Sequence, residues 1–232
     1  IPYDALVIAT GVRPRTPGWA ANLAGVHLLR TVADARALRK SLARSRRVVV
    51  VGGGFIGSEV ASSARTLGLH VTIVEARDVP FAAALGETAG RLCAALHRAH
   101  GTELRCGVTV TALDGTGRVE KVLLSDGSVL KADTVVVGVG SHPNTEWLKG
   151  SGVACTDGVE CDAALRTTVP GVYAVGDVAR WFNPWLGRKV RVEHWTNAAH
   201  QAAAVARGIA TGQPDTPHAS IPYFWSDWYG RR

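Results

Sequence analysis

The chain has 232 residues, enough for one large domain or two smaller domains, each with its own hydrophobic core. A hydrophobic content of 47% and a charged content of 19% are typical of a globular protein and argue against intrinsic disorder, and the longest apolar runs are too short to span a bilayer. The formal net charge is +7, but the most basic stretch, RALRKSLARSRR, lacks the interleaved aromatic residues that stack on bases, which argues against a nucleic-acid-binding protein.

The chain opens with IPYDALVIATG, which predicts a buried strand that runs into a tight turn. Ile1 is not an initiator residue, and the sequence contains no methionine. Because a buried strand needs neighbours on both sides and nothing precedes this one, we expect the start of its domain to be absent.

Predicted strands alternate with predicted helices along the chain, which is typical of parallel βαβ units. In the helix at 31–43, Thr31 is expected to cap the N-terminus, and Asp34 follows at the spacing of a capping box. Residues 16–25 are expected to form a loop, and residues 118–131 a hairpin that turns at Asp126-Gly127. The other expected helices are 56–68, 84–101 and 197–209, and the expected strands are 3–11, 46–54, 70–76, 102–113, 133–140 and 171–177.

The basic stretch falls on the helix at 31–43 and the residues after it. It predicts either a solvated helix face or a positive surface that attracts an acidic partner or a phosphate-bearing ligand.

The four cysteines form no C-x-x-C pair, and no histidine stands at metal-ligand spacing from them, so no metal site is predicted. Cys155 and Cys161 are close enough in sequence to raise the question of a disulfide, and the alternative is four free thiols in a reducing compartment. The expected location is the cytoplasm.

The segment VVVVGGGFIGSE places Gly52, Gly54 and Gly57 in G-x-G-x-x-G spacing between a predicted strand and a predicted helix. The next strand ends in an acid, Glu75, which completes the pattern of a dinucleotide-binding βαβ unit. Gly52 permits the tight turn, Gly54 lets the backbone approach a pyrophosphate, and Gly57 lets helix and strand pack closely. Glu75 would accept hydrogen bonds from the adenosine ribose and repel a 2′-phosphate, which favours NADH, although Arg77 nearby leaves NADPH open.

The segments ATGVRPR, GGGFIGSE, GVYAVGDVAR, VRVEHWTNAAHQA and PYFWSD resemble, in this order, the FAD-dependent pyridine nucleotide-disulphide oxidoreductases. Within them the chain is most similar to the ferredoxin and rubredoxin reductase branch, which also resembles apoptosis-inducing factor. The resemblance implies an α/β fold in which a Rossmann-like NAD(H)-binding domain is inserted into a partial FAD-binding domain of the same type. It implies FAD-domain pieces at 1–29 and 150–217, the NAD(H)-binding domain at 30–149 and the beginning of a C-terminal α+β domain at 218–232. It also implies a member truncated at both ends.

In the predicted flavin site, Asp177 ends a strand, so that its carboxylate could accept a hydrogen bond from a ribityl hydroxyl, and Gly176 permits a close approach of the backbone. The helix at 197–209, with Thr196 or Asn197 as its cap, would direct its positive dipole end at the flavin. Trp195 and Trp225 resemble the aromatic residues that flank the flavin, with plain core tryptophans as the alternative. Arg13 matches the arginine that contacts FAD, unless it is a surface charge, and Glu59 and Glu193 resemble acids near the nicotinamide. The full set of predicted cofactor-binding residues is Thr10, Gly11, Arg13, Gly52, Gly53, Gly54, Phe55, Ile56, Gly57, Glu59, Glu75, Gly140, Gly176, Asp177, Glu193, His194, Trp195 and Trp225.

The resemblance implies an enzyme that uses FAD and NAD(H), passes a hydride from NADH to the flavin, and then passes single electrons to a ferredoxin or a rubredoxin. Hydride transfer needs no side-chain acid or base, so no catalytic residue is predicted. One alternative is a non-catalytic NAD-binding fragment that retains FAD weakly, because the loop that holds the FAD pyrophosphate is expected to be missing. Another is an NADH oxidoreductase similar to apoptosis-inducing factor. Neither a membrane partner nor a particular oligomeric state is predicted.

Overall fold

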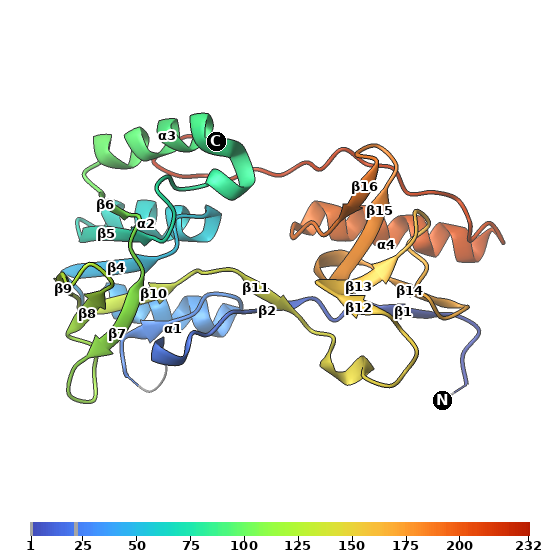
Figure 1. Ribbon diagram of the computed structural model, residues 1–232, viewed down its shortest axis with the longest axis horizontal. Coiled ribbons are helices and arrows are strands. Elements are labelled where there is room, and N and C mark those ends of the chain that lie inside the picture. The colour runs from blue at the N-terminus through green and yellow to red at the C-terminus, as the bar shows by residue number, and fades with distance from the viewer. Residues whose placement is uncertain (1, 21–22) are drawn as a thin grey trace. The chain divides into compact units, whose positions relative to one another are not determined.

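The computed structural model describes residues 2–20 and 23–232, and the chain forms two compact units (Figure 1). Unit 1 contains the residues up to Arg13 together with Ser141–Trp225. Unit 2 contains Pro14–Gly140 together with Ser226–Arg232.

Unit 2 is built on a five-stranded parallel sheet with the strand order β3-β10-β4-β5-β6. A smaller antiparallel sheet, β7-β8-β9, and three helices complete it. The bounds are β3 (Val26–His27), α1 (Val32–Leu42), β4 (Arg47–Val51), α2 (Phe55–Thr66), β5 (His70–Glu75), α3 (Ala82–Ala99), β6 (Glu103–Cys106), β7 (Val110–Asp114), β8 (Lys121–Leu124), β9 (Val129–Lys131) and β10 (Thr134–Val137), with a 3-10 turn, η1, at Gly18–Ala20.

The four consecutive valines of β4 are buried because both faces of the central sheet are covered, as is usual for parallel strands. Val48 and Val50 pack with residues of α1 and α2 on one face. Val49 and Val51 pack on the other face with residues of the β7-β8-β9 sheet and of the segment that contains η1. Strand β4 therefore contributes side chains to the cores on both faces of the sheet, and it ends at the glycine-rich loop.

Unit 1 contains a parallel pair, β1-β14, and a four-stranded sheet, β12-β13-β15-β16, around a core that includes the fully buried Trp181. Its elements are β1 (Leu6–Ile8), η2 (Glu146–Leu148), β12 (Cys155–Thr156), β13 (Gly158–Cys161), β14 (Val172–Ala174), η3 (Gly176–Val178), β15 (Ala179–Asn183), β16 (Arg188–Val190) and α4 (Trp195–Ala210). Strands β2 (Val12–Pro14) and β11 (Ser141–Pro143) form a further two-stranded sheet.

The expected helices and most expected strands are present, with local corrections. The single strand predicted at 102–113 breaks at Gly107, whose φ of +72° turns the chain from the parallel sheet into the antiparallel one. Strands β2, β3, β11, β12, β13 and β16 are too short to show a clear alternating pattern and were not predicted. The longer strand β15 was also not predicted, because its buried positions combine Ala179, Trp181 and Asn183 and give no apolar run. The first predicted strand is only partly buried, because Val7 of β1 is exposed while Ile8 is buried.

The chain passes from one compact unit to the other between Arg13 and Pro14 and between Gly140 and Ser141. The domain boundaries were expected at 29/30 and 149/150. The physical reason is packing. Trp19, Leu23 and Val26 contact the core of unit 2, and Leu148 belongs to the core of unit 1. The segment 218–232, expected to begin a further domain, is divided between the two units, with residues up to Trp225 in unit 1 and Ser226–Arg232 in unit 2.

Candidate dinucleotide-binding site

The glycine-rich loop joins β4 to α2, and its geometry requires glycine at two positions. Gly52 has a φ of +105°, and a Cβ atom there would lie 2.3 Å from the carbonyl oxygen of Gly138. A Cβ atom at Gly57 would lie 2.1 Å from the carbonyl oxygen of Gly52. Gly52 therefore makes the turn and Gly57 lets the helix pack on the loop.

Gly54 differs from these two, because a Cβ atom built there would meet no atom of the described chain within 4 Å. The space in front of Gly54 is open, and the residue is the N-cap of α2. Gly54 makes no side-chain cap hydrogen bond, and a helix N-terminus without such a cap offers its first N–H groups to an anion. A ligand can approach the backbone here more closely than any other residue would allow.

Glu75, the last residue of β5, fastens the loop to the neighbouring strand. One carboxylate oxygen, Oε2, accepts a hydrogen bond from the Gly53 N–H at 2.7 Å, and the other, Oε1, accepts one from the Arg77 N–H at 2.9 Å. The carboxylate is thus held at the carboxyl edge of the parallel sheet, where ligands of such sheets bind.

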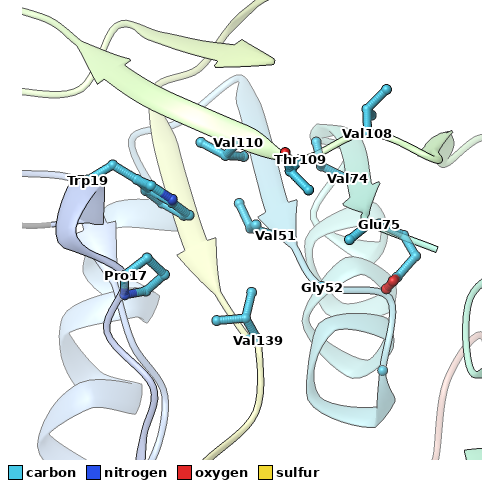
Figure 2. A pocket seen from close by; sticks show the side chains of 13 residues that line it. Pro17, Trp19, Val51, Gly52, Val74, Glu75, Val108, Thr109, Val110 and Val139 are labelled. Carbon is cyan, nitrogen blue, oxygen red and sulfur yellow. The ribbon is translucent and has the colours of Figure 1, made fainter. Parts of the chain in front are cut away.

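A pocket of about 410 Å³ opens beside this loop (Figure 2). Its walls are mainly apolar, and Glu75 and Thr109 are the polar side chains that the structure shows along it. It is lined by Pro17, Trp19, Val51, Gly52, Gly54, Val74, Glu75, Ala76, Val108, Thr109, Val110, Gly138 and Val139. A volume of this size is typical of pockets for small ligands and cofactors.

Of the predicted residues, Gly52, Gly54 and Glu75 line the pocket. Gly53 binds Glu75, and the ring of Phe55 packs edge-to-face on Phe81. Ile56 is exposed. Glu59 accepts a hydrogen bond from Ser226, and the carbonyl oxygen of Gly140 accepts one from the N–H of Arg15.

The walls formed by Pro17, Trp19 and Val108–Val110 were missed by the sequence analysis. Pro17 and Trp19 lie in a segment expected to be a loop of another domain, and Val108 and Thr109 lie within a predicted strand. The valine-glycine run at 133–140, which places Gly138 and Val139 at the carboxyl end of β10, is the one local signal that could have revealed part of the wall.

The remaining predicted residues belong to unit 1. Gly176, with a φ of +74°, donates its N–H to the side-chain oxygen of the buried Gln201 at 2.7 Å. The side-chain nitrogen of Gln201 has no hydrogen-bond partner in the part of the chain that the structure describes. The prediction that Asp177 ends a strand is wrong, because β14 ends at Ala174 and Asp177 lies in the 3-10 turn η3, which α4 holds through Gln201.

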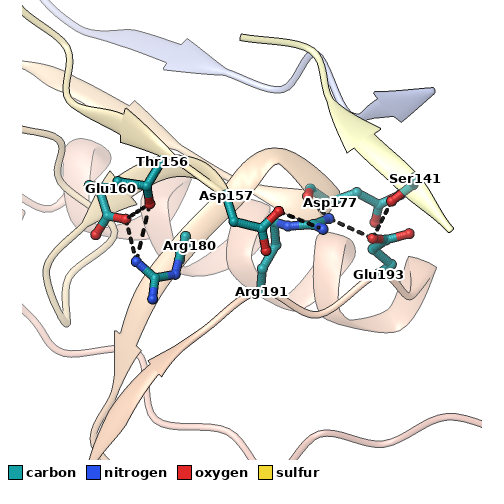
Figure 3. A network of polar contacts seen from close by, with 8 residues as sticks. All are labelled: Ser141, Thr156, Asp157, Glu160, Asp177, Arg180, Arg191 and Glu193. Carbon is teal, nitrogen blue, oxygen red and sulfur yellow. Dashed lines mark hydrogen bonds and ion pairs between the residues drawn. The ribbon is translucent and has the colours of Figure 1, made fainter. Parts of the chain in front are cut away.

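A charged network surrounds Asp177 and Glu193 (Figure 3). The largely buried guanidinium of Arg191 pairs with Asp157 at 3.1 Å and with Glu193 at 2.6 Å, and it donates a hydrogen bond to the carbonyl oxygen of Asp177. The hydroxyl of Ser141 also donates to Glu193. Arg191, which the sequence analysis did not single out, therefore positions two of the predicted residues.

Helix α4 is capped by His194, whose Nδ1 accepts a hydrogen bond from the Thr196 N–H. The prediction of Thr196 or Asn197 as the cap is wrong, because the helix begins at Trp195 and Asn197 instead donates its side-chain amide to the Val192 carbonyl. Trp195 packs edge-to-face with Trp225 at a centroid distance of 5.5 Å. The interpretation of Trp195 as a plain core residue is excluded, because 65% of its surface is exposed.

Arg13 pairs with Glu146 and also donates to the side chain of Asn144. The side chain of Thr10 donates to the Asn144 carbonyl, and the N–H of Asn144 donates to the Gly11 carbonyl. Contacts of this group with FAD stay predictions.

The four cysteines are free thiols, so Cys155 and Cys161 form no disulfide with each other. Burial raises the pKa of the Cys161 thiol to about 12. Within residues 2–20 and 23–232, no cluster of three or more metal-ligating side chains was found. In the same residues, every helix is too short or too polar to cross a bilayer.

Residues 1–202 match the family model described as pyridine nucleotide-disulphide oxidoreductase. The chain is 41% identical over 231 residues to the ferredoxin–NAD(+) reductase component of the anthranilate 1,2-dioxygenase system of Burkholderia cepacia, with 99% of this chain and 56% of the relative covered. It is 37% identical over 230 residues to the rubredoxin-NAD(+) reductase of Ectopseudomonas oleovorans, with coverage of 98% and 59%.

Among solved structures, the chain is similar to the ferredoxin reductase for the CYP199A2 system from Rhodopseudomonas palustris, with a TM-score of 0.93 and 37% identity over 99% of this chain and 57% of that one. The chain thus spans about half the length of the curated relatives it matches. The agreement of the family model, the relatives and the fold shows that the chain belongs to the pyridine nucleotide-disulphide oxidoreductase family.

Proposed function

We propose that this chain is the NAD(H)-binding part, together with a portion of the FAD-binding part, of a flavoprotein reductase that transfers electrons from NADH to a ferredoxin or a rubredoxin. The single observation that carries the proposal is the glycine loop fastened by Glu75 beside an apolar pocket. The relatives named as ferredoxin and rubredoxin reductases support the choice of electron acceptor.

The residues of unit 2 fit a dinucleotide. The open space at Gly54 and the start of α2 would accept the pyrophosphate, and the pocket would accept the apolar faces of the adenosine. Glu75 presents a carboxylate that is already oriented by two N–H groups, so a ribose with two free hydroxyls is favoured over one with a 2′-phosphate. The geometry therefore supports NADH as the preferred nucleotide.

The residues of unit 1 fit a portion of a flavin site. Gly176 and Asp177 lie in the 3-10 turn η3 after β14 and are held by Gln201 and Arg191. The buried side-chain nitrogen of Gln201 lacks an acceptor in the described chain. Helix α4 presents its N-terminus together with the exposed Trp195. When bound, the nicotinamide and the flavin supply hydride and single-electron chemistry, and the side chains of the protein bind, orient and shield them.

The electron acceptor we propose is a small iron–sulfur protein or a rubredoxin. Arg36, Arg39, Lys40 and Arg44 are exposed on and just after α1, so the basic stretch is available to attract an acidic partner. The four free thiols support a reducing compartment, and we propose the cytoplasm.

The test is a titration of the chain with NADH and with NADPH, in the presence and absence of added FAD, followed by calorimetry and by the visible spectrum of the flavin. The proposal expects NADH to bind without FAD and more tightly than NADPH. Bleaching of the added flavin by NADH would show that this chain itself binds FAD and catalyses its reduction. NADH binding without a flavin signal would favour a nucleotide-binding fragment whose reductase activity belongs to a longer protein, and failure to bind NADH would refute the proposal.

A further inference from the structure

Residues Ser226–Arg232 follow unit 1 in the sequence but are part of unit 2, where they lie against α2 and α3 (Figure 1). We call this segment the tail. The hydroxyl of Ser226 donates a hydrogen bond to the Glu59 carboxylate at 2.6 Å, and the Tyr229 N–H donates to the Ser62 hydroxyl at 2.7 Å. Both acceptors belong to α2, the helix that starts at the glycine-rich loop.

A buried histidine connects the tail to a third residue of the same helix. The Tyr229 hydroxyl lies 2.9 Å from Nδ1 of His97 and 2.7 Å from Oγ1 of Thr102. The other ring nitrogen of His97, Nε2, lies 3.0 Å from the hydroxyl of Ser58, the residue directly after Gly57. His97 and Ser58 have no exposed surface, so the hydrogen bond between them is shielded from water, whereas Tyr229 is half-buried.

Aromatic rings hold the tail in place. Trp228 stacks on Phe81 with a centroid distance of 5.7 Å and lies 4.8 Å from the His97 ring. Tyr229 stacks on His100 at 4.3 Å. Because Phe81 also contacts Phe55, the first residue of α2, this packing continues to the end of the helix next to the loop.

The backbone of the tail is strained at Tyr229, the residue that makes most of these contacts. Trp228 and Arg231 exchange two backbone hydrogen bonds, and the two residues between them, Tyr229 and Gly230, have φ values of +53° and +70°. Both positions of such a turn favour glycine or asparagine, and a tyrosine there is uncommon. Strain of this kind persists where the surrounding contacts over-determine the conformation, and it points to a role for the residue.

We propose that the tail is a latch that positions α2 for nucleotide binding, with Ser226 and Tyr229 as its positioning residues. The inference rests on the proposed function, because it takes the loop and α2 as the NAD(H) site. Ser58, Glu59 and Ser62 lie within five consecutive residues of α2, and each is held by the tail directly or through His97. With the latch seated, the N–H groups of the first turn keep the orientation that the pyrophosphate requires, and without it the helix can shift against β4.

The experiment compares two latch variants, Ser226→Ala and Tyr229→Phe, with matched controls in the full chain. The control for serine is Ser63→Ala, because Ser63 is exposed on the same helix, and the control for tyrosine is Tyr3→Phe, because Tyr3 is exposed in unit 1. Ser226→Thr keeps the hydroxyl and serves as the conservative rescue. The dissociation constant for NADH is measured by calorimetry, and hydrogen exchange of peptides that cover residues 55–66 is measured without nucleotide.

We expect each latch variant to weaken NADH binding about threefold to tenfold, because Ser226→Ala loses the hydrogen bond to Glu59 and Tyr229→Phe loses those to His97 and Thr102. Exchange in residues 55–66 should become faster, while the controls and Ser226→Thr stay within about twofold of the parent chain in affinity. Circular dichroism checks that each variant is folded, and Ser226→Ala, which leaves the aromatic packing intact, keeps the test valid if Tyr229→Phe unfolds.

Unchanged affinity in both latch variants overturns the latch, whether or not exchange becomes faster, because the tail would then be only structural. Failure of the parent chain to bind NADH has a different meaning, since it refutes the proposed function on which the latch depends. The two failures are therefore distinguishable.

Discussion

Glu75 combines two tasks at the scale of a single residue. Its carboxylate oxygens accept hydrogen bonds from two backbone N–H groups, which fixes the side chain, and its charge remains beside the pocket. A fixed charge discriminates between ligands more strongly than a mobile one, because a phosphate cannot push it aside. If the proposed function holds, we expect the preference between NADH and NADPH to depend on this residue.

Replacing Glu75 with glutamine should reduce the preference for NADH over NADPH about tenfold, because the repulsion of a 2′-phosphate is lost along with a charge-assisted hydrogen bond to the ribose. The measurement is the ratio of the two dissociation constants. Glu87→Gln serves as the control, since Glu87 is an exposed residue paired with Arg91 on α3. An unchanged ratio in Glu75→Gln would contradict the role given to this carboxylate.

His97 gives the protein a dependence of stability on pH. Burial, together with a smaller contribution from the neighbouring His100, lowers the pKa of His97 from 6.5 to about 4. The folded state therefore resists protonation, whereas the unfolded chain takes up the proton near pH 6.5. The free energy of unfolding should fall by about 3 kcal/mol between pH 6.5 and pH 4 through this residue, and it should be insensitive to His97 above pH 6.5.

Urea unfolding at a series of pH values measures this effect. His97→Gln cannot gain the charge, so its stability should be lower near neutral pH, where hydrogen bonds are lost, but should decline less between pH 6.5 and pH 4. Parallel profiles for the two proteins would show that His97 does not carry the pH dependence.

At the scale of elements, α1 shows a helix whose beginning is encoded locally. The Thr31 hydroxyl accepts a hydrogen bond from the Asp34 N–H, and the Asp34 carboxylate accepts one from the Thr31 N–H, which together form the predicted capping box. The hydrogen bonds to Thr31 and the backbone of Arg30 lower the pKa of Asp34. Leu38 and Leu42 then fix the helix on the sheet.

Thr31→Ala removes one half of this box and should lower the free energy of unfolding of unit 2 by about 1 kcal/mol. Thr31→Ser keeps the hydroxyl and should restore most of the loss. Chemical denaturation followed by circular dichroism measures both. Equal destabilisation by alanine and serine would show that the cap hydrogen bond is not the cause.

Elements defined by short-range chemistry were predictable, and surfaces made by distant segments were not. The capping box at Thr31, the turn at Gly127 and the loop of Gly52, Gly54 and Gly57 each depend on a few consecutive residues. The cap at His194 was missed because serine, threonine, aspartate and asparagine are the usual caps, and a histidine ring can fill this role only when its backbone is extended there. The pocket wall at Trp19 and the seat of Tyr229 depend on contacts over more than 50 residues, which no local pattern records.

At the scale of the whole molecule, the chain consists of two compact units, each with its own buried core. Proteins with two separately packed units need not unfold in a single cooperative step. Leu148 is buried in the core of unit 1, and Leu38 in a core of unit 2. These two leucines allow the stability of each unit to be altered separately.

Leu148→Ala should destabilise unit 1 by about 2–5 kcal/mol and leave the affinity for NADH unchanged, because the nucleotide pocket lies within unit 2. Leu38→Ala should instead destabilise unit 2. Near the temperature at which unit 2 unfolds, the apparent affinity for NADH should therefore fall. Thermal unfolding with and without NADH separates the two effects. Equal loss of NADH binding in both variants would contradict the assignment of the pocket to one unit.

The interrupted sequence of unit 2 has a consequence for how the protein is made. The tail is synthesised only after the 85 residues of Ser141–Trp225, so at roughly 5–20 residues per second the ribosome needs roughly 4–17 s to cover that interval. During this time the glycine loop, α2 and α3 are complete, but Phe81 and His97 lack the rings that later cover them. The contacts of Trp228 and Tyr229 with Phe81 and His97 therefore form only after the nucleotide unit has been made and Ser226–Arg232 have been synthesised.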